Sequence, residues 1–274
     1  MSLPILNIPH QPSREDLIRF FHRTELHWVR HLAEETALES GTAFANPAFP
    51  GVHDANNLRD AVLPEGWSGH QAMDEVDAFY AAQGTRCAYW VMNPSAPAEQ
   101  TAPLAEHLLQ RHFTTDIAEI MRLARTPYAA RAPATEVPGL KIIPARSSFR
   151  HARQLAEGSA QRWNCPELAD ATMLHLDDPH WDALIALKDG QAIAHVGVLA
   201  VGDIGRIENL WVAPEMRGLG IGRTMMGRAL EICARSLFHH VFLNVLPGNS
   251  AAIALYQHMG FDKIGEITYY RSPA

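Results

Sequence analysis

The sequence has few cysteines, no long apolar run and no excess of basic residues. Its three cysteines, Cys87, Cys165 and Cys233, are odd in number and far apart, which favours neither a disulfide framework nor a zinc site. No segment approaches the roughly 18 consecutive apolar residues that a membrane span requires. A net charge of −7 argues against nucleic-acid binding through bulk electrostatics. We therefore expect no metal, no membrane and no nucleic-acid partner.

The first ten residues lack both the basic segment and the continuous apolar segment of a secretion signal. Hydrophobic residues make up 47% of the chain and charged residues 19%, which is ordinary for a globular protein. The length of 274 residues exceeds the roughly 150 residues of a typical domain. These features predict a cytoplasmic protein with two domains.

An alanine- and proline-rich segment, residues 128–139, divides the chain. The predicted division is an N-terminal domain over residues 1–130, a linker over 131–138, and a C-terminal domain over 139–274.

After the linker, apolar patterns and turn residues alternate regularly. Asp189 and Gly190, for example, are typical of a tight hairpin turn between two strands. Residues 163–180 show no clear pattern and are expected to be irregular. The predicted strands cover 140–145, 181–188, 191–201, 204–212, 240–245 and 264–271, and the predicted helices cover 149–162, 223–237 and 250–258.

A glycine-rich loop, R-G-L-G-I-G at residues 217–222, lies between a predicted strand and a predicted helix. Glycines permit a left-handed backbone and close approach of a ligand. The helix start adds unpaired N–H groups and a positive dipole end, so the segment could bind phosphate. A Rossmann fingerprint starting at Gly220 would require a small residue where Met225 stands. A Walker A loop starting at Gly218 would require lysine where Arg223 stands.

The remaining pattern, R-x-x-G-x-G, resembles the loop with which the GCN5-related N-acetyltransferase (GNAT) superfamily binds the pyrophosphate of acetyl-CoA. A second pattern, N-x-x-A-x-x-x-Y-x-x-x-G-F from Asn249 to Phe261, resembles another GNAT motif, and every specified position matches. The resemblance covers residues 140–271. It implies a GNAT acyl-CoA N-acyltransferase fold of the α/β (α+β) class, with a mixed, mostly antiparallel sheet.

The first half shows a partial echo of this order. We interpret residues 1–130 as a smaller, degenerate GNAT-like α/β domain in a tandem arrangement, although helix–strand–helix echoes are common in α/β chains. A helix from Ser13 to about Leu38 and a loop segment over 42–69, with one short strand at most, are expected before the echo. Its elements are a helix over 70–82, a strand over 85–92, a helix over 101–110 and Phe113, which follow the order of 223–237, 240–245, 250–259 and Phe261. In this correspondence Leu108 takes the place of Tyr256, and Gly66 to Gly69 take the place of the glycine loop.

The resemblance implies acetyl-CoA as co-substrate and no metal. The main chain of Leu210 and Val212 would bind the pantetheine arm, and a main-chain N–H near Leu210 or Trp211 would face the thioester oxygen. The expected acetyl-CoA-binding residues are Leu210, Trp211, Val212, Arg217, Gly218, Leu219, Gly220, Ile221, Gly222, Arg223, Asn249, Ala252 and Tyr256.

Tyr256 and Glu208 are the expected catalytic residues. The resemblance implies that Tyr256 protonates the coenzyme A sulfur; the alternative is a tyrosine that only packs in the core. Strand alternation predicts Glu208 on the same face as Leu210 and Val212, where partial desolvation would suit a general base acting through water. The alternative for Glu208 is a salt bridge with Arg206.

The resulting hypothesis is an acetyl-CoA-dependent N-acetyltransferase that moves an acetyl group to a primary amine by direct attack in a ternary complex. The alternative is a non-catalytic acyl-CoA-binding regulatory or scaffold protein. The acceptor is a small-molecule amine or a peptide amine, and the sequence does not distinguish them. The chain is expected to be a monomer whose halves form an internal pseudo-dimer, or a homodimer.

Overall fold

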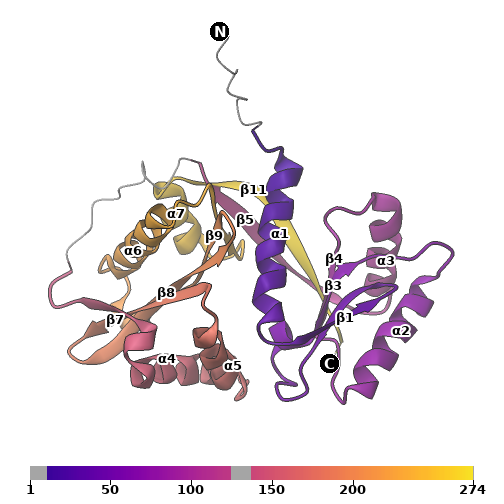
Figure 1. The fold of residues 1–274 in the computed structure, drawn as a ribbon, viewed down its shortest axis with the longest axis horizontal. Coiled ribbons are helices and arrows are strands. Elements are labelled where there is room, and N and C mark those ends of the chain that lie inside the picture. The colour runs from indigo at the N-terminus through magenta and orange to yellow at the C-terminus, as the bar shows by residue number, and fades with distance from the viewer. Residues whose placement is uncertain (1–10, 125–136, 274) are drawn as a thin grey trace, which may run out of the picture.

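The computed structural model describes residues 11–124 and 137–273 (Figure 1). Its first half contains α1 (Arg14–Arg30), β1 (Glu34–Leu38), β2 (Gly41–Ala45), β3 (Asn57–Ala61), α2 (Gly69–Ala82), β4 (Tyr89–Met92), α3 (Ala98–Gln110) and β5 (Thr114–Leu123). Its second half contains β6 (Lys141–Pro144), α4 (Phe149–Arg162), α5 (Leu168–Leu174), β7 (Trp181–Lys188), β8 (Gln191–Val201), β9 (Ile204–Val212), α6 (Ile221–Arg235), β10 (His240–Val245), α7 (Ser250–His258) and β11 (Phe261–Arg271). Most of the predicted linker 131–138 lies outside the described residues.

All the strands form one 11-stranded sheet in the order β1-β2-β3-β4-β11-β5-β10-β9-β8-β7-β6. The halves exchange strands at its centre. Strand β5 of the first half lies between β11 and β10, and β11 of the second half lies between β4 and β5. The first half thereby covers an edge of the second half's sheet, because β5 pairs with β10 along its outer side.

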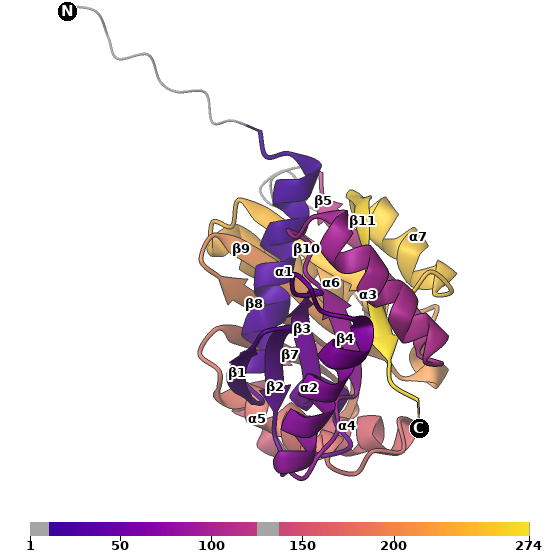
Figure 2. The same ribbon diagram turned by 90° about the vertical axis from the view of Figure 1, so that its right-hand side faces the viewer.

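The two halves repeat the same pairing pattern around this centre. Strands β3 and β4 are parallel and are connected through α2, and β9 and β10 are parallel and are connected through α6. Figure 2 shows α3 and α7, which occupy corresponding places in the two halves, on the same side of the sheet. The predicted echo in the order of elements is therefore present in the structure.

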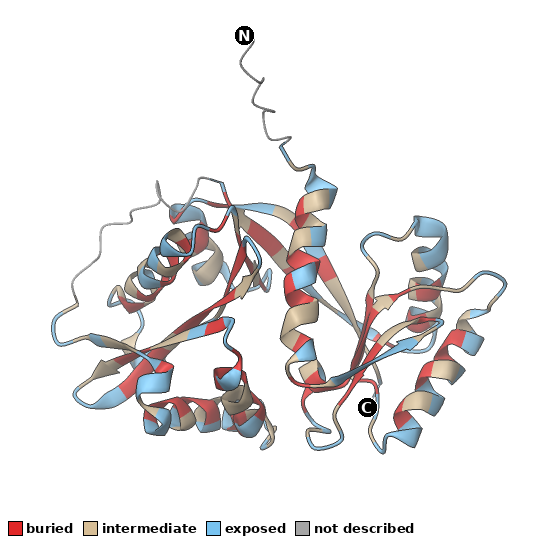
Figure 3. Cartoon of the chain, viewed as in Figure 1, coloured by how far each residue is buried: buried red, intermediate tan, exposed pale blue. Residues whose placement is uncertain are grey.

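Helices cover both faces of the sheet, and the buried residues lie where helices and strands meet (Figure 3). Helices α6 and α7 bury one core cluster of the second half, and α2 and α3 bury the corresponding cluster of the first half. Helix α1 lies between the halves and packs on the opposite face, where Leu17 and Phe21 contact Ile204 and Phe242. A capping box starts α1, with Asp16 N donating to Ser13 Oγ at 3.1 Å.

Three sequence predictions about secondary structure were wrong. Helix α1 ends at Arg30 rather than near Leu38, because residues 34–38 pair with β2 as strand β1. The segment 42–69 contains most of β2 and all of β3, and the segment 163–180 contains α5. These elements are five to seven residues long, too short for apolar periodicity to identify them, and tertiary contacts decide their conformation. No helix of residues 11–124 or 137–273 is both long and apolar enough to cross a bilayer.

Candidate active site

Strands β9 and β10 begin side by side and then diverge. Their parallel pairing covers only Ile204 to Arg206 and His240 to Phe242, after which β10 pairs with β5 alone. The main chain of β9 beyond Ile207 therefore has no strand partner on this side. Such a separation between parallel strands opens a cleft at their carboxyl ends, where ligands of open sheets commonly bind.

The glycine loop follows the open end of β9. Gly218 and Gly220 have left-handed backbones, with φ of 78° and 81°. Gly220 is the N-cap of α6, and no side chain caps this helix. A Cβ added at Gly218 would meet no heavy atom within 4 Å, so this part of the loop is open to a ligand. Arg217 donates from Nε to the carbonyl of Val212 at 3.1 Å and fixes the loop to the strand end.

The second motif forms the start and the buried face of α7. Asn249 is the N-cap of this helix, and its side chain accepts a hydrogen bond from Ala252 N at 3.3 Å. Tyr256 is 8% exposed and packs in the core cluster beneath α6 and α7. Burial raises the pKa of Tyr256 to about 12, with the charge of Glu208 contributing. The phenol is therefore protonated at neutral pH.

A β-bulge lies in β9 just before the strand reaches the cleft. The pairing of β8 with β9 joins Gly197 to Glu208 and His195 to Trp211, so two residues of β9 oppose one residue of β8. Asn209, within the bulge, has a left-handed backbone with φ of 56°. A bulge adds one residue to a strand and changes which face the following side chains occupy.

The bulge makes one sequence prediction wrong. Strand alternation placed Glu208 on the face of Leu210 and Val212, but these two residues pack toward the core cluster of α6. Glu208 instead shares the opposite face with Trp211, because their partners on β8 are two residues apart. Glu208 and Tyr256 therefore approach the cleft from opposite faces of the sheet.

Glu208 forms a salt bridge with Arg206, which is the alternative that the sequence left open for it. Arg206 Nε and Glu208 Oε1 are 2.8 Å apart, but their alignment leaves both atoms without a hydrogen-bond partner among the residues described. Burial raises the pKa of Glu208 to about 7, and the positive charge of Arg206 opposes this rise. A carboxyl group with this pKa can accept a proton near neutral pH.

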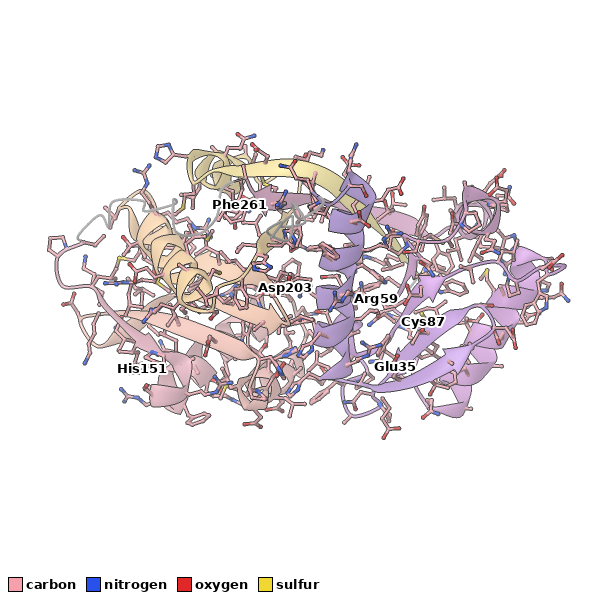
Figure 4. The ribbon with its side chains drawn as sticks, turned by 45° about the horizontal axis from the view of Figure 1, so that its top comes forward. Glu35, Arg59, Cys87, His151, Asp203 and Phe261 are labelled. Atoms are coloured by element: carbon pink, nitrogen blue, oxygen red, sulfur yellow. The ribbon has the colours of Figure 1, made fainter. Side chains whose placement is uncertain are left out.

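A buried cluster of charged residues around Glu25 connects the two halves. Glu25 on α1 accepts hydrogen bonds from Arg59 Nη1 at 2.9 Å and from the Tyr269 hydroxyl at 3.1 Å, and it also pairs with Arg206. Figure 4 shows Arg59 beside α1, on a strand of the first half. Burial disfavours the charged carboxylate, but Arg206 and Arg59 outweigh it and lower the pKa of Glu25 to about 2.

A cavity of about 500 Å³ lies between the halves, on the face that carries Glu208. Its lining includes Glu25 of α1, His195 of β8, Glu208 of β9 and Asn244 of β10, so it extends from the interface of the halves to the cleft. Tyr256 and the glycine loop are not among the lining residues; they lie on the other side of the cleft.

Sequence reasoning missed Glu25 as part of the site. The sequence does place Glu25 on the apolar face of the first helix, four residues after Phe21 and three before Trp28. A carboxylate at such a position is rarely buried without partners. Both of its arginine partners come from strands distant in the sequence, so spacing alone could not identify them.

Three other side chains could ligate a metal ion. His27, Asp178 and His180 offer ligand atoms that all lie within 4.8 Å of one another. Asp178 already accepts from both imidazoles, at 3.0 Å from His27 Nε2 and 3.1 Å from His180 Nδ1. These contacts give the cluster a hydrogen-bonded structure in the absence of an ion.

The corresponding helix start in the first half is closed by side chains. Ser68 caps α2 by accepting from Gln71 N at 3.3 Å, where α6 has only Gly220. His107 also lies over this helix start, since a Cβ added at Gly69 would come within 2.4 Å of its ring. The first half therefore lacks the open helix end that could bind a diphosphate.

Comparisons with known proteins agree with this geometry. Residues 147–261 match the acetyltransferase (GNAT) family model. The putative ribosomal protein bS18-alanine N-acetyltransferase of Bacillus subtilis is 31% identical over 90 residues, which cover 33% of this chain and 60% of that protein. Mycothiol acetyltransferase of Kocuria rhizophila is 25% identical over 194 residues, which cover 62% of each chain. The matched segments span 48% to 62% of the length of the first three curated relatives.

Solved structures share the fold over most of the chain. A GCN5-related N-acetyltransferase from Kribbella flavida has a TM-score of 0.63 at 13% identity, covering 93% of this chain and 95% of that chain. A tandem GNAT protein from the clavulanic acid biosynthesis pathway has a TM-score of 0.52 at 17% identity, covering 75% and 70%. These likenesses show that the fold is that of GNAT proteins. More specifically, the chain contains an acetyltransferase domain of the GNAT superfamily.

Proposed function

We propose that this chain is an acetyl-CoA-dependent N-acetyltransferase that transfers an acetyl group to a primary amine by direct attack in a ternary complex. The observation that carries the proposal is the open N-terminus of α6. Its N-cap, Gly220, has no side-chain cap and lies next to the diverging ends of β9 and β10. The acetyltransferase names of the relatives support the same class of reaction.

Acetyl-CoA fits the groups present at this end of the sheet. The backbone N–H groups of residues 221–223 start a helix that no side chain caps, which suits a diphosphate. Arg223 is exposed beside them and adds a positive charge. The main chain of β9 at Leu210 and Val212 has no strand partner on the β10 side, and there it can bind the amide groups of the pantetheine arm. Acetyl-CoA is the co-substrate, and it brings the thioester to the cavity end of the cleft.

Glu208 is the proposed general base. An amine enters the cavity as an ammonium ion and must lose a proton before its nitrogen can attack. Glu208 accepts this proton, directly or through one water, because its pKa of about 7 keeps a large fraction ionised at neutral pH. Holding both substrates in one site supplies several kcal/mol through proximity alone.

Tyr256 is the proposed general acid on the other side of the cleft. The amine nitrogen forms a bond with the thioester carbonyl carbon, and the carbon–sulfur bond breaks. Tyr256 gives its phenolic proton to the departing sulfur, and the second proton that the attacking nitrogen loses restores the phenol. A main-chain N–H near Leu210 or Trp211 stabilises the carbonyl oxygen while it carries negative charge.

An amine-panel assay tests the proposal. Purified protein with acetyl-CoA should release free coenzyme A only when an acceptor amine is added, and mass spectrometry should find the acetyl group on that amine. A non-catalytic acyl-CoA-binding protein would bind acetyl-CoA in calorimetry and release no thiol with any amine. This second result would refute the proposed transfer.

A further inference from the structure

The cavity between the halves carries an excess of negative charge. Of the residues that the structure describes, four acidic and two arginine residues line it: the acids are Glu25, Asp54, Asp116 and Glu208, and the bases are Arg206 and Arg271. Burial lowers the pKa of His175 to about 3 and that of His195 to about 4, so both imidazoles are neutral. This balance favours a cationic ligand.

Three of the four carboxylates already have donors. Asp54 accepts from Trp28 Nε1 at 3.1 Å and from the Tyr89 hydroxyl. Asp116 accepts from Arg271 Nε at 2.9 Å.

Glu25, the third, is held by two arginines and a tyrosine. Glu208 differs, because it has a salt bridge with Arg206 but its Oε1 accepts no hydrogen bond within the described part of the protein. Glu208 is therefore the carboxylate that an incoming ammonium group can engage.

An aromatic ring lies beside Glu208. Trp181 packs over Gly197, which is the β8 partner of Glu208 in the sheet. The approach is so close that a Cβ added at Gly197 would lie 2.0 Å from Cη2 of Trp181. A tryptophan face attracts ammonium ions, and the attraction grows when water is excluded. Glu208 and Trp181 thus line the same cavity on the same face of the sheet.

The rest of the cavity is mainly apolar. Trp28 meets Trp181 edge to face, with ring centroids 5.0 Å apart. Aliphatic side chains, including Leu155, Leu176 and Ile185, continue this wall between α4 and the sheet. A volume of about 500 Å³ falls within the range for drug-sized ligands. A small polar amine would leave most of this apolar surface without a partner.

We infer that the acceptor is a primary amine with an aromatic or similarly bulky apolar group, whose ammonium is held between Glu208 and the ring of Trp181. The inference rests on the proposed function for the acetylation step, but the binding site can be tested separately. The acetyl group moves from the thioester sulfur to the amine nitrogen, which loses two protons: the ammonium gives one to Glu208 before the attack, and the second balances the proton that Tyr256 gives to the sulfur.

The first test compares 2-phenylethylamine with ethanolamine at saturating acetyl-CoA. We expect kcat/KM to be at least about tenfold higher for 2-phenylethylamine, because its phenyl ring can be buried against the apolar side chains of the cavity. Equal values, or a higher value for ethanolamine or for a peptide with a free N-terminal alanine, would overturn the inference.

The second test uses variants of Trp181. Trp181→Leu should lower kcat/KM for 2-phenylethylamine about tenfold more than for ethanolamine, and Trp181→Phe should restore most of the difference, since it keeps an aromatic face. Phe149→Leu changes an exposed aromatic residue outside the cavity and is the matched control. If Trp181→Leu lowers kcat/KM for both amines by the same factor, Trp181 does not recognise the acceptor. Circular dichroism excludes unfolding, and the wild-type comparison remains decisive if a variant fails to fold.

Calorimetry separates this inference from the proposed function. Titrating 2-phenylethylamine into protein saturated with coenzyme A measures acceptor binding without turnover. Binding without acetylation would support the cavity site and refute the proposed transfer. Acetylation of other amines, without binding of 2-phenylethylamine, would support the transfer and overturn the inference about the acceptor.

Discussion

Asp60 in β3 and Asn209 in β9 have nearly the same left-handed backbone, with φ of 53° and 56°. They occupy corresponding places in the two halves. In the first half, Leu58 of β3 pairs with β2, and Asp60 follows it by two positions. In the second half, Ile207 of β9 pairs with β8, and Asn209 follows it by two positions. Non-glycine residues with positive φ are uncommon, so their agreement supports a true structural repeat.

The residue before each of these positions differs between the halves. Glu208 precedes Asn209, whereas Arg59 precedes Asp60. The first half therefore has a guanidinium group where the second has its proposed base. Arg59 instead binds Glu25 and helps to hold the halves together. The corresponding position has a structural role in one half and a chemical role in the other.

Replacing Glu208 with glutamine tests the base. The Glu208→Gln variant should lose about 10²- to 10⁴-fold in kcat/KM. Wild-type activity should rise as the pH increases through about 7, because the carboxylate is the active form and its pKa is raised to that value. The variant should lack this rise. A pH–rate profile with the same inflection in both proteins would assign the base to another group.

The same raised pKa makes a prediction about stability. The folded protein holds the Glu208 proton more tightly than the unfolded chain does, since the pKa rises from 4.5 to about 7. The contribution to stability is therefore present below pH 4.5 and is lost as the pH rises through about 7, by about 3 kcal/mol. Urea unfolding at several pH values should show this loss in the wild type and a smaller loss in Glu208→Gln.

Replacing Gly220 with valine tests the phosphate-binding loop. Gly220 has a φ of 81°, which a β-branched residue adopts only with strain. Gly220→Val should abolish coenzyme A binding in calorimetry while the chain stays folded. Gly227→Ala, on the same helix, is the control, because a Cβ there meets no atom within 4 Å. Wild-type affinity in Gly220→Val would remove the loop from the proposed site.

The same titration of wild-type protein should give one coenzyme A per chain. The start of α2 carries the Ser68 cap and lies under His107, so the first half offers no second diphosphate site. A stoichiometry of two would contradict its assignment as a degenerate copy.

Replacing Tyr256 with phenylalanine tests the acid. Tyr256→Phe should lower kcat at least tenfold and change the KM for acetyl-CoA less, because the sulfur receives its proton only as the carbon–sulfur bond breaks. Packing should be preserved, since the change removes one oxygen from a ring in the core cluster. An unchanged kcat, with the chemical step shown to be rate-limiting, would reduce Tyr256 to a packing role.

Replacing Glu25 with alanine tests the connection between the halves. The change leaves Arg59 and Arg206 buried without their shared carboxylate. We expect a loss of about 3–5 kcal/mol in the free energy of unfolding, measured by urea titration. Glu35→Ala removes the exposed partner of Arg30 and should cost less than about 1 kcal/mol. Similar losses in both variants would show that the buried cluster does not stabilise the interface.

The sequence by itself determined most of the secondary structure of the second half. Strands β7 to β10 and helix α4 have the predicted bounds, because alternating apolar residues and turn signals such as Asp189–Gly190 are local. The positive φ at Gly218 and Gly220 and the cap at Asn249 also follow from nearby residues. Local geometry of this kind can be inferred from motif spacing.

Only the tertiary structure decided how the two halves and the two faces of the site combine. The exchange of β5 and β11 depends on pairings more than 130 residues apart, which no local pattern encodes. The bulge at Asn209 moved Glu208 to the face opposite Val212, because one extra residue reverses strand alternation. Burial raises the pKa of Glu208 against the opposing charge of Arg206. Arg206 in turn pairs with Glu25 of α1, which belongs to the first half of the chain.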